Sequence, residues 1–111
     1  MMDIEPAQTA PAVTGFANDM LARANLTTDF LKSLSHPSRL VVLCRLAEGP
    51  CPVGALEALL MLPQAEVSKQ LARLRADGLV TTERRGRSMI YSLVGGRTAR
   101  VVQMLHDEFC P

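Results

Sequence analysis

Apolar side chains recur at helical spacing in five stretches of this chain. The stretches cover residues 16–34, 37–46, about 52–60, about 64–77 and about 97–109. Because residues three or four positions apart share one face of a helix, each stretch predicts an amphipathic helix. We expect the first helix to be irregular around residues 25–28, where Asn and two Thr interrupt the pattern. Gly49-Pro50 and Gly78 mark the ends of the second and fourth helices.

Residues 79–93 have the composition of strands. Two segments rich in Val, Thr, Ile and Tyr, 79–84 and 88–93, flank Arg85-Gly86-Arg87. A glycine between two such segments predicts a β-hairpin. A short helix, a tight turn, a second helix and a basic hairpin follow one another in this order, which is the arrangement of a winged helix-turn-helix. The predicted fold is therefore mainly α-helical with a small β-hairpin.

The composition agrees with this fold. The chain has 111 residues, of which 48% are hydrophobic and 4% aromatic, and a core with so few aromatic rings is more typical of packed helices than of a β-sandwich. Residues 1–13 are rich in Pro and Ala without periodicity, so we expect a flexible N-terminal arm there and one domain over residues 14–111. The sequence has neither a membrane-spanning run nor a secretory signal. We therefore expect a cytoplasmic protein whose three cysteines are reduced.

Positive charge is concentrated in one part of the chain. The net charge is only +1, but residues 64–100 carry eight Lys and Arg side chains against three Asp and Glu. This segment contains the expected fourth helix and the hairpin. A basic block in an otherwise balanced chain is typical of a surface that binds a polyanion. Together with the predicted fold, it favours double-stranded DNA as the partner.

Polar residues near the start of the fourth helix and on the hairpin are the candidate DNA contacts. The N-terminal part of a helix in the major groove can bring an amide, a hydroxyl or an ammonium group to base edges. Arginines on a hairpin can contact phosphates or the minor groove. The candidates are Gln64, Ser68, Lys69 and Gln70 on the helix and Arg84, Arg85 and Arg87 on the hairpin. The alternative interpretation is that Lys69 and Gln70 are ordinary solvent-facing residues and that the hairpin is purely structural.

Three separated blocks of sequence resemble the ArsR/SmtB family of dimeric winged-helix repressors. The blocks are LKSLSHPSRL at 31–40, LARLRADGLV at 71–80 and IYSL at 90–93, and the resemblance extends over about residues 16–110. It implies a homodimer joined through the first and last helices and bound to an inverted-repeat operator. It also implies that Gln64, Ser68 and Lys69 match the base-contacting positions of the family. Glu66 departs from the small or hydroxyl residue common there, which leaves the operator preference open.

Many members of this family sense metals, but the expected ligands are missing from this chain. Residues 53–59, before the turn, contain neither Cys nor His. The last helix offers His106, Asp107 and Glu108, which are too few and at the wrong helical phase for a zinc site. We therefore expect no metal and no other cofactor. The alternative is a soft-metal or arsenite site built from Cys44, Cys51 and Cys110.

The positions of Cys44 and Cys110 resemble those of a sulfide- and persulfide-responsive subgroup of the family (BigR- and SqrR-like). The resemblance implies that the reduced dimer represses. Reactive sulfur species would then link Cys44 to Cys110 within a subunit, through a disulfide or a longer polysulfide, and release the DNA. The alternative is that Cys44 is a small core residue and that Cys110 is inert. We expect His106, four residues before Cys110, to be an ordinary surface histidine.

Two other classes of function fit the sequence less well. A thiol peroxidase or disulfide reductase needs a CxxC pair or a reactive Cys near a helix N-terminus, and cysteines at 44, 51 and 110 form no CxxC. A helical interaction module without a DNA partner would not bind duplexes with a steep salt dependence. We therefore expect a regulator and not an enzyme.

Overall fold

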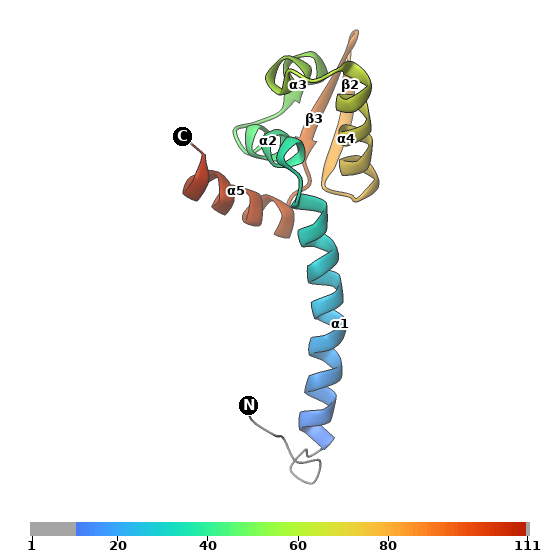
Figure 1. Ribbon diagram of the computed structural model, residues 1–111, viewed down its shortest axis with the longest axis vertical. Coiled ribbons are helices and arrows are strands. Elements are labelled where there is room, and N and C mark those ends of the chain that lie inside the picture. Colours follow the sequence, from blue (N-terminus) through green and yellow to red (C-terminus); the bar gives the residue numbers. More distant parts are fainter. Residues whose placement is uncertain (1–10, 111) are drawn as a thin grey trace. The chain divides into compact units, whose positions relative to one another are not determined.

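The computed structural model describes residues 11–110, with side chains from residue 15 onward (Figure 1). The chain divides into two compact units, residues 1–32 and 33–111. No helix within the described residues is both long and apolar enough to cross a membrane.

α1 (Pro11–Leu34) is one uninterrupted helix (Figure 1). It begins at Pro11 rather than at residue 16, and the irregularity expected at residues 25–28 is absent. The reason is that the hydroxyls of Thr27 and Thr28 donate hydrogen bonds to the carbonyl oxygens of Arg23 and Ala24 (2.7 and 2.9 Å), so that both side chains are satisfied within the helix. Of the expected N-terminal arm, residues 1–10 lie outside the described residues and residues 11–13 belong to α1.

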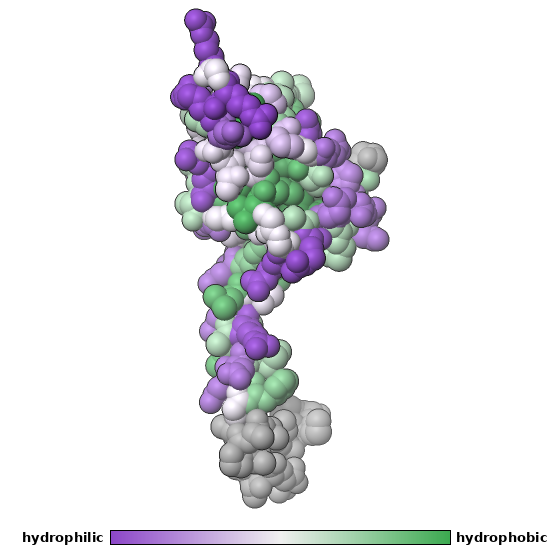
Figure 2. All heavy atoms as spheres, turned by 180° about the vertical axis from the view of Figure 1, so that it is seen from behind, coloured by the Kyte–Doolittle hydropathy of each residue, from purple (hydrophilic) through white to green (hydrophobic). Residues whose placement is uncertain are grey.

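Large apolar side chains of α1 are exposed to solvent. They are Phe16, Met20, Leu21, Leu26 and Leu31. Figure 2 shows apolar and hydrophilic residues interleaved along this helix. A row of apolar residues left in solvent is typical of a helix that packs against another molecule.

α2 (Pro37–Leu46) is the central element of the second unit. It contacts α3 (Val53–Leu60), α4 (Gln64–Ala76), α5 (Arg97–Phe109) and β3 (Ser88–Leu93) (Figure 1). α2 begins where the sequence predicts: the Nδ1 atom of His36 accepts a hydrogen bond from the Ser38 N–H (3.1 Å), and Pro37 occupies the first turn. The core around α2 is apolar and consists mainly of Leu34, Val42, Leu43, Leu46, Leu56, Val67, Leu71, Leu74, Leu79, Val80, Tyr91 and Val102.

α3 and α4 form the predicted helix-turn-helix, and the hairpin follows directly. Met61 ends α3 in the left-handed conformation (φ 55°), which turns the chain toward α4. β2 (Val80–Arg85) pairs with β3 in antiparallel register from Val80↔Leu93 to Arg85↔Ser88. Gly86, at φ 61°, allows the two-residue connection between these strands. The mainly helical fold with a basic hairpin is therefore confirmed.

One strand was not predicted. β1 (Cys51–Pro52) pairs antiparallel with β3, Cys51 opposite Tyr91, and the strand order is β1-β3-β2. Two residues cannot show the alternation by which strands are recognised, and the proline argues against a strand. The pairing leaves Cys51 only 1% exposed. Cys51 is therefore a core residue and is shielded from reagents in solution.

Candidate functional site

The expected base-reading residues lie on the exposed side of α4. Gln64, Ser68 and Lys69 are all exposed. Gln64 is the first residue of the helix, and its Nε2 atom donates a hydrogen bond to the Glu57 carboxylate on α3 (3.4 Å). This contact holds the Gln64 side chain at the helix-turn-helix junction without burying it. The three side chains are therefore available to a duplex.

Gln70 is not a surface residue, contrary to expectation. It is only 4% exposed, its Oε1 atom accepts a hydrogen bond from Arg39 (2.8 Å), and its Nε2 atom donates to Glu66 (2.6 Å). Arg39 in turn donates to the carbonyl oxygen of Ser33 (2.8 Å). Gln70 therefore links α4 to α2 from inside the fold. It shares the helical face of Val67, Leu71 and Leu74, and this spacing is the sequence signal that points to its burial.

The arginines of the hairpin are exposed. Arg84, Arg85 and Arg87 all lie at its solvent-facing end, where Arg85 is paired with Ser88 across the ladder. The Arg85 guanidinium forms an ion pair with Glu83 on the same strand (3.1 Å), and both side chains are more than half exposed. The hairpin thus presents three guanidinium groups and one carboxylate. This combination can contact phosphates, with Glu83 offsetting part of the attraction.

Cys44 and Cys110 are brought together, although they come from opposite ends of the second unit. Cys44 lies on α2, and Cys110 is the residue that caps the C-terminus of α5. Their side chains interact directly, and both line the same groove. Burial, this interaction with Cys110 and the charge of nearby Glu48 raise the pKa of Cys44 to about 11. Both cysteines are free thiols, and neither is fully buried.

The two thiols line an apolar groove between α2 and α5. The groove has a volume of about 370 Å³, and its other lining residues are Leu40, Val41, Leu105 and Phe109. Val41 and Phe109 are partly in solvent, at 43% and 79% exposure. Cys44 therefore does not lie on the buried stripe of α2, which consists of Val42, Leu43 and Leu46. It lies on a second apolar face of that helix, turned toward α5.

His106 and Glu48, which the sequence did not single out as a pair, lie beside the thiols. The Nε2 atom of His106 is 2.9 Å from the Glu48 carboxylate, and both residues share a groove with Cys44 and Cys110. The bond with Glu48, helped by Asp107, raises the pKa of His106, although partial burial opposes this. The same bond lowers the pKa of Glu48. The expectation of an ordinary surface histidine is therefore wrong, and no local sequence signal could reveal a partner so distant along the chain.

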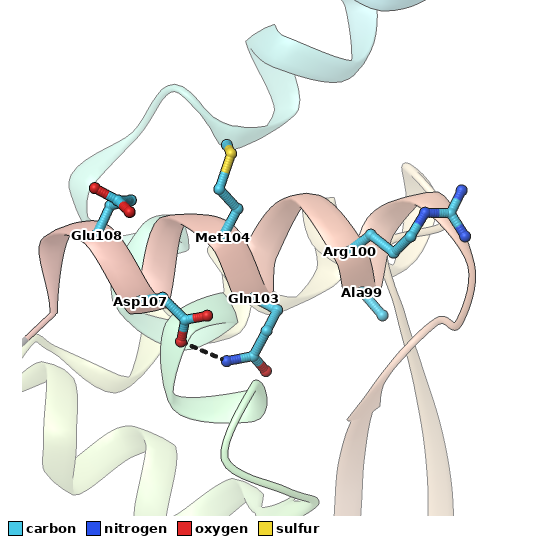
Figure 3. Close-up of a pocket in the computed structure, with 6 residues that line it drawn as sticks. All are labelled: Ala99, Arg100, Gln103, Met104, Asp107 and Glu108. Atoms are coloured by element: carbon cyan, nitrogen blue, oxygen red, sulfur yellow. Dashed lines mark hydrogen bonds between the residues drawn. The ribbon is translucent and has the colours of Figure 1, made fainter.

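The opposite side of α5 carries a different groove. It is lined by Ala99, Arg100, Gln103, Met104, Asp107 and Glu108 and has a volume of about 560 Å³ (Figure 3). The Nε2 atom of Gln103 donates a hydrogen bond to Asp107 (2.8 Å). Asp107 and Glu108 line this groove, but His106 does not. The three potential ligands of the last helix are therefore not gathered into one site.

The cysteines do not form a three-thiol site either. Cys51 belongs to the strand β1 and lines neither of the grooves that Cys44 and Cys110 share. Within the described residues, no group of three or more His, Cys, Asp or Glu side chains is arranged to hold a metal ion. The chemistry that this arrangement does offer is that of a dithiol beside an imidazole and a carboxylate.

Comparison with known proteins identifies the family. Residues 36–82 match the family described as bacterial regulatory protein, arsR family. The chain is 40% identical over 102 residues to the biofilm growth-associated repressor of Xylella fastidiosa strain Temecula1, covering 92% of this chain and 88% of that protein.

Two solved structures extend the comparison to the fold. The crystal structure of the transcriptional repressor BigR from Xylella fastidiosa has a TM-score of 0.79 at 40% identity, over 85% of this chain and 93% of that chain. The homodimeric winged helix-turn-helix DNA-binding domain of a possible ArsR-family regulator from Mycobacterium bovis has a TM-score of 0.68 at 26% identity, over 79% of this chain and 82% of that chain. These relatives exclude the thiol-enzyme alternative, and the chain is a member of the ArsR family of bacterial regulatory proteins, with a winged helix-turn-helix fold.

Proposed function

We propose that this regulator is a dithiol-switched repressor. In the proposed cycle, the reduced homodimer binds an inverted-repeat operator in the cytoplasm. Reactive sulfur species then link Cys44 to Cys110 within each subunit, and the linked dimer releases the DNA. The observation that carries the proposal is that Cys44 and Cys110 line the same groove and interact directly. Two cysteines that face each other across one groove need little movement to be joined by one bond or by a short sulfur chain.

The raised pKa of Cys44 supports an order for the proposed chemistry. With a pKa of about 11, Cys44 stays protonated at neutral pH, so Cys110 is the first nucleophile. The Cys110 thiolate attacks the outer sulfur of a persulfide RS–SH, which gives Cys110–S–SH and RS⁻. Cys44 then attacks the inner sulfur, Sγ of Cys110, and the departing HS⁻ takes up the thiol proton as H₂S. Two thiols are thereby oxidised to a disulfide, and the persulfide is reduced to a thiol and sulfide.

A longer link forms in the same way. A second persulfide converts Cys44 to Cys44–S–SH and releases another thiol. The outer sulfur of Cys44–S–SH then attacks Sγ of Cys110–S–SH and again displaces HS⁻, leaving a trisulfide. The groove next to the thiols, about 370 Å³ in volume, offers space for an inserted sulfur atom.

The link would act on DNA binding through α2. This helix carries Cys44 on one face, while its other face packs against α3, α4 and β3. A covalent bond from α2 to the end of α5 fixes the spacing between these helices, which are otherwise held by non-covalent contacts alone. Switches of this kind change affinity by about 1–3 kcal/mol, or about 5- to 150-fold. A change of that size is sufficient for derepression.

The proposed homodimer rests on the exposed apolar residues of the outer helices and on the resemblance to a family of dimers. Phe16, Met20 and Leu21 on α1 and Met104 on α5 are all more than 40% exposed. The Mycobacterium bovis relative is homodimeric. A dimer presents two copies of α4 to an inverted repeat, with Gln64, Ser68 and Lys69 as base-reading residues and Arg84, Arg85 and Arg87 as phosphate contacts. We propose these roles from the exposure of the residues and from the family resemblance.

The test of the function uses the two single-cysteine variants. An operator is first selected from a random-sequence duplex library with the reduced wild-type protein. Cys44→Ser and Cys110→Ser are each expected to bind this operator like the reduced wild type but to stay bound after treatment with glutathione persulfide. Cys51→Ser is the control, because the buried Cys51 lies outside the dithiol, and it is expected to respond normally. A normal response from either Cys44→Ser or Cys110→Ser would show that the pair is not the sensor.

A further inference from the structure

Two side-chain contacts join the C-terminal end of α2 to the C-terminal end of α5 in this groove. One is the pair of thiols, and the other is the pair of His106 and Glu48. Cys44 lies four residues before Glu48, and Cys110 lies four residues after His106. All four side chains line the same groove, so the contact of Cys44 with Cys110 and that of Glu48 with His106 lie next to each other. The second contact is short, with 2.9 Å between the His106 Nε2 and Glu48 Oε2 atoms.

Resting on the function proposed above, we propose that the ion pair of His106 and Glu48 positions Cys110 for its reaction with Cys44. Cys110 lies beyond the end of α5 in an extended conformation (φ −89°, ψ 143°), and its N–H donates to the His106 carbonyl oxygen (3.0 Å). His106 thus holds the backbone of Cys110 through its carbonyl group and is itself held to the α2 side by its imidazole. His106 and Glu48 are positioning residues, because the sulfur chemistry takes place on the two thiols.

The charge around the imidazole makes this positioning depend on pH. On the α2 side, His106 faces Glu48, with Arg45 close to the same carboxylate. On α5 itself, the Nδ1 atom of His106 is 3.6 Å from the Asp107 carboxylate. The thiols of Cys44 and Cys110 line the same groove as His106. The apolar Leu59 of α3 also lines that groove. A protonated imidazole is attracted by the carboxylates of both Glu48 and Asp107. A neutral imidazole can still donate one N–H to Glu48, but this hydrogen bond is weaker because the donor carries no charge.

The experiment measures how fast the link forms. Reduced full-length protein is treated with sodium tetrasulfide between pH 6 and 8.5, quenched with iodoacetamide, and analysed by intact mass for the chain that carries a Cys44–Cys110 link. Each rate is divided by the wild-type rate at the same pH, which cancels the titration of the reagent. Loss of the Glu48 charge would lower the pKa of Cys44 and speed its reaction, which is opposite to the loss of rate expected here. His106→Ala and Glu48→Gln break the ion pair, and His106→Gln retains a donor without a charge. Glu108→Gln is the matched control, since it removes a carboxylate of the same helix end on the opposite groove.

We expect His106→Ala and Glu48→Gln to link about tenfold more slowly than the wild type at pH 6, because lost positioning lowers the effective concentration of one thiol at the other. The difference in linking rate between the wild type and these two variants becomes smaller as pH rises, because wild-type His106 loses its proton. His106→Gln has an intermediate rate, and its ratio to the wild type also rises with pH, whereas Glu108→Gln follows the wild type throughout. If His106→Ala unfolds, Glu48→Gln alone tests the proposal. This variant should fold, because Glu48 is exposed and glutamine has nearly the same shape as glutamate.

The outcomes separate the two proposals. If the wild type forms no link at any pH, the dithiol switch is wrong and the positioning role is wrong with it. If the wild type links and both His106→Ala and Glu48→Gln link at the wild-type rate, the switch stands and the positioning role is overturned. A slower rate whose ratio to the wild type does not change with pH, and is not improved in His106→Gln, would also overturn it, because a general loosening of the fold would have that signature.

Discussion

The thiols of Cys44 and Cys110 contact each other, although one lies in the last turn of α2 and the other follows the last turn of α5. This contact turns two isolated cysteines into a chemical unit. It also makes the two sulfurs unequal, because burial and the contact itself keep Cys44 protonated. The asymmetry gives the first prediction.

Alkylation is expected to be slow at Cys44. With a pKa of about 11, about one Cys44 in a thousand is a thiolate at pH 8. The rate of its reaction with iodoacetamide should therefore keep rising until the pH reaches about 11. In Cys110→Ala the midpoint should fall, because the interaction with Cys110 is gone while burial remains. Peptide mass spectrometry over a pH series measures both midpoints. A wild-type midpoint near 9, the ordinary value for a thiol, would contradict the environment described for Cys44.

The hairpin is expected to control affinity without regard to sequence. Arg85→Ala should weaken binding to operator and random duplexes alike and reduce the slope of log affinity against log salt by about one unit. Glu83→Gln should do the opposite, because it removes a carboxylate that repels phosphates and frees Arg85 from its ion pair. Fluorescence anisotropy titrations at several salt concentrations measure both effects. The prediction requires Arg85→Ala to bind more weakly and Glu83→Gln to bind more tightly than the wild type. A loss of affinity in both variants would argue that the ion pair only stabilises the hairpin.

Lys69 is expected to contribute to sequence preference as well as to affinity. Its side chain is exposed on α4, in the half of the helix that would enter the major groove. Lys69→Ala should therefore lose more affinity for the selected operator than for random DNA. Repeating the library selection with the variant shows whether the preferred base changes. Equal losses on operator and random duplexes would assign Lys69 to phosphate binding instead.

Gln70 is expected to matter for stability rather than for base reading. Gln70→Ala leaves Arg39 and Glu66 without their shared partner inside the fold, which should lower the free energy of unfolding by about 1–3 kcal/mol. The neighbouring Lys69→Ala, at an exposed position, should change it by no more than about 0.5 kcal/mol. Urea unfolding followed by circular dichroism compares the two. Similar unfolding midpoints for both variants would contradict the structural role of Gln70.

Most of the fold could be predicted from local patterns. The helices and the hairpin have clear periodicity, and the cap at His36 and the end of α4 at Gly78 follow from residue type alone. The strand β1 could not be predicted, because its two residues are strand-like only through pairing with β3. The expected irregularity of α1 at residues 25–28 was also wrong, since Thr27 and Thr28 favour other conformations unless their hydroxyls bond back to the helix.

The candidate site was only partly predictable, for a similar reason. The exposure of Lys69 and of the hairpin arginines follows from helical phase and from their place near a turn. Gln70 was misplaced because its amide suggested a surface position, whereas its spacing from Val67, Leu71 and Leu74 puts it on the buried face. The pairing of His106 with Glu48 depends on how α5 packs against α2. Such a contact has no local signature, and only the folded chain reveals it.

The ion pair of His106 and Glu48 is expected to contribute to stability within a limited pH range. The pKa of His106 is raised, so its contribution is complete below 6.5 and is lost as pH rises through the folded-state value. The pKa of Glu48 is lowered, so its contribution is complete above 4.5 and is lost as pH falls through the folded-state value. The difference in Tm between the wild type and Glu48→Gln should therefore be largest between pH 4.5 and 6.5. A difference that grows steadily toward pH 9 would contradict the assignment.

The switch is tested most directly by measuring covalent state and DNA binding on one sample. Reduced protein is titrated with glutathione persulfide, and each point is divided between operator anisotropy and intact plus tryptic mass spectrometry. Operator affinity should fall as the fraction of chains with a Cys44–Cys110 link rises, and dithiothreitol should reverse both changes together. DNA release without the linked peptide, or complete linkage with unchanged operator affinity, would contradict the dithiol switch.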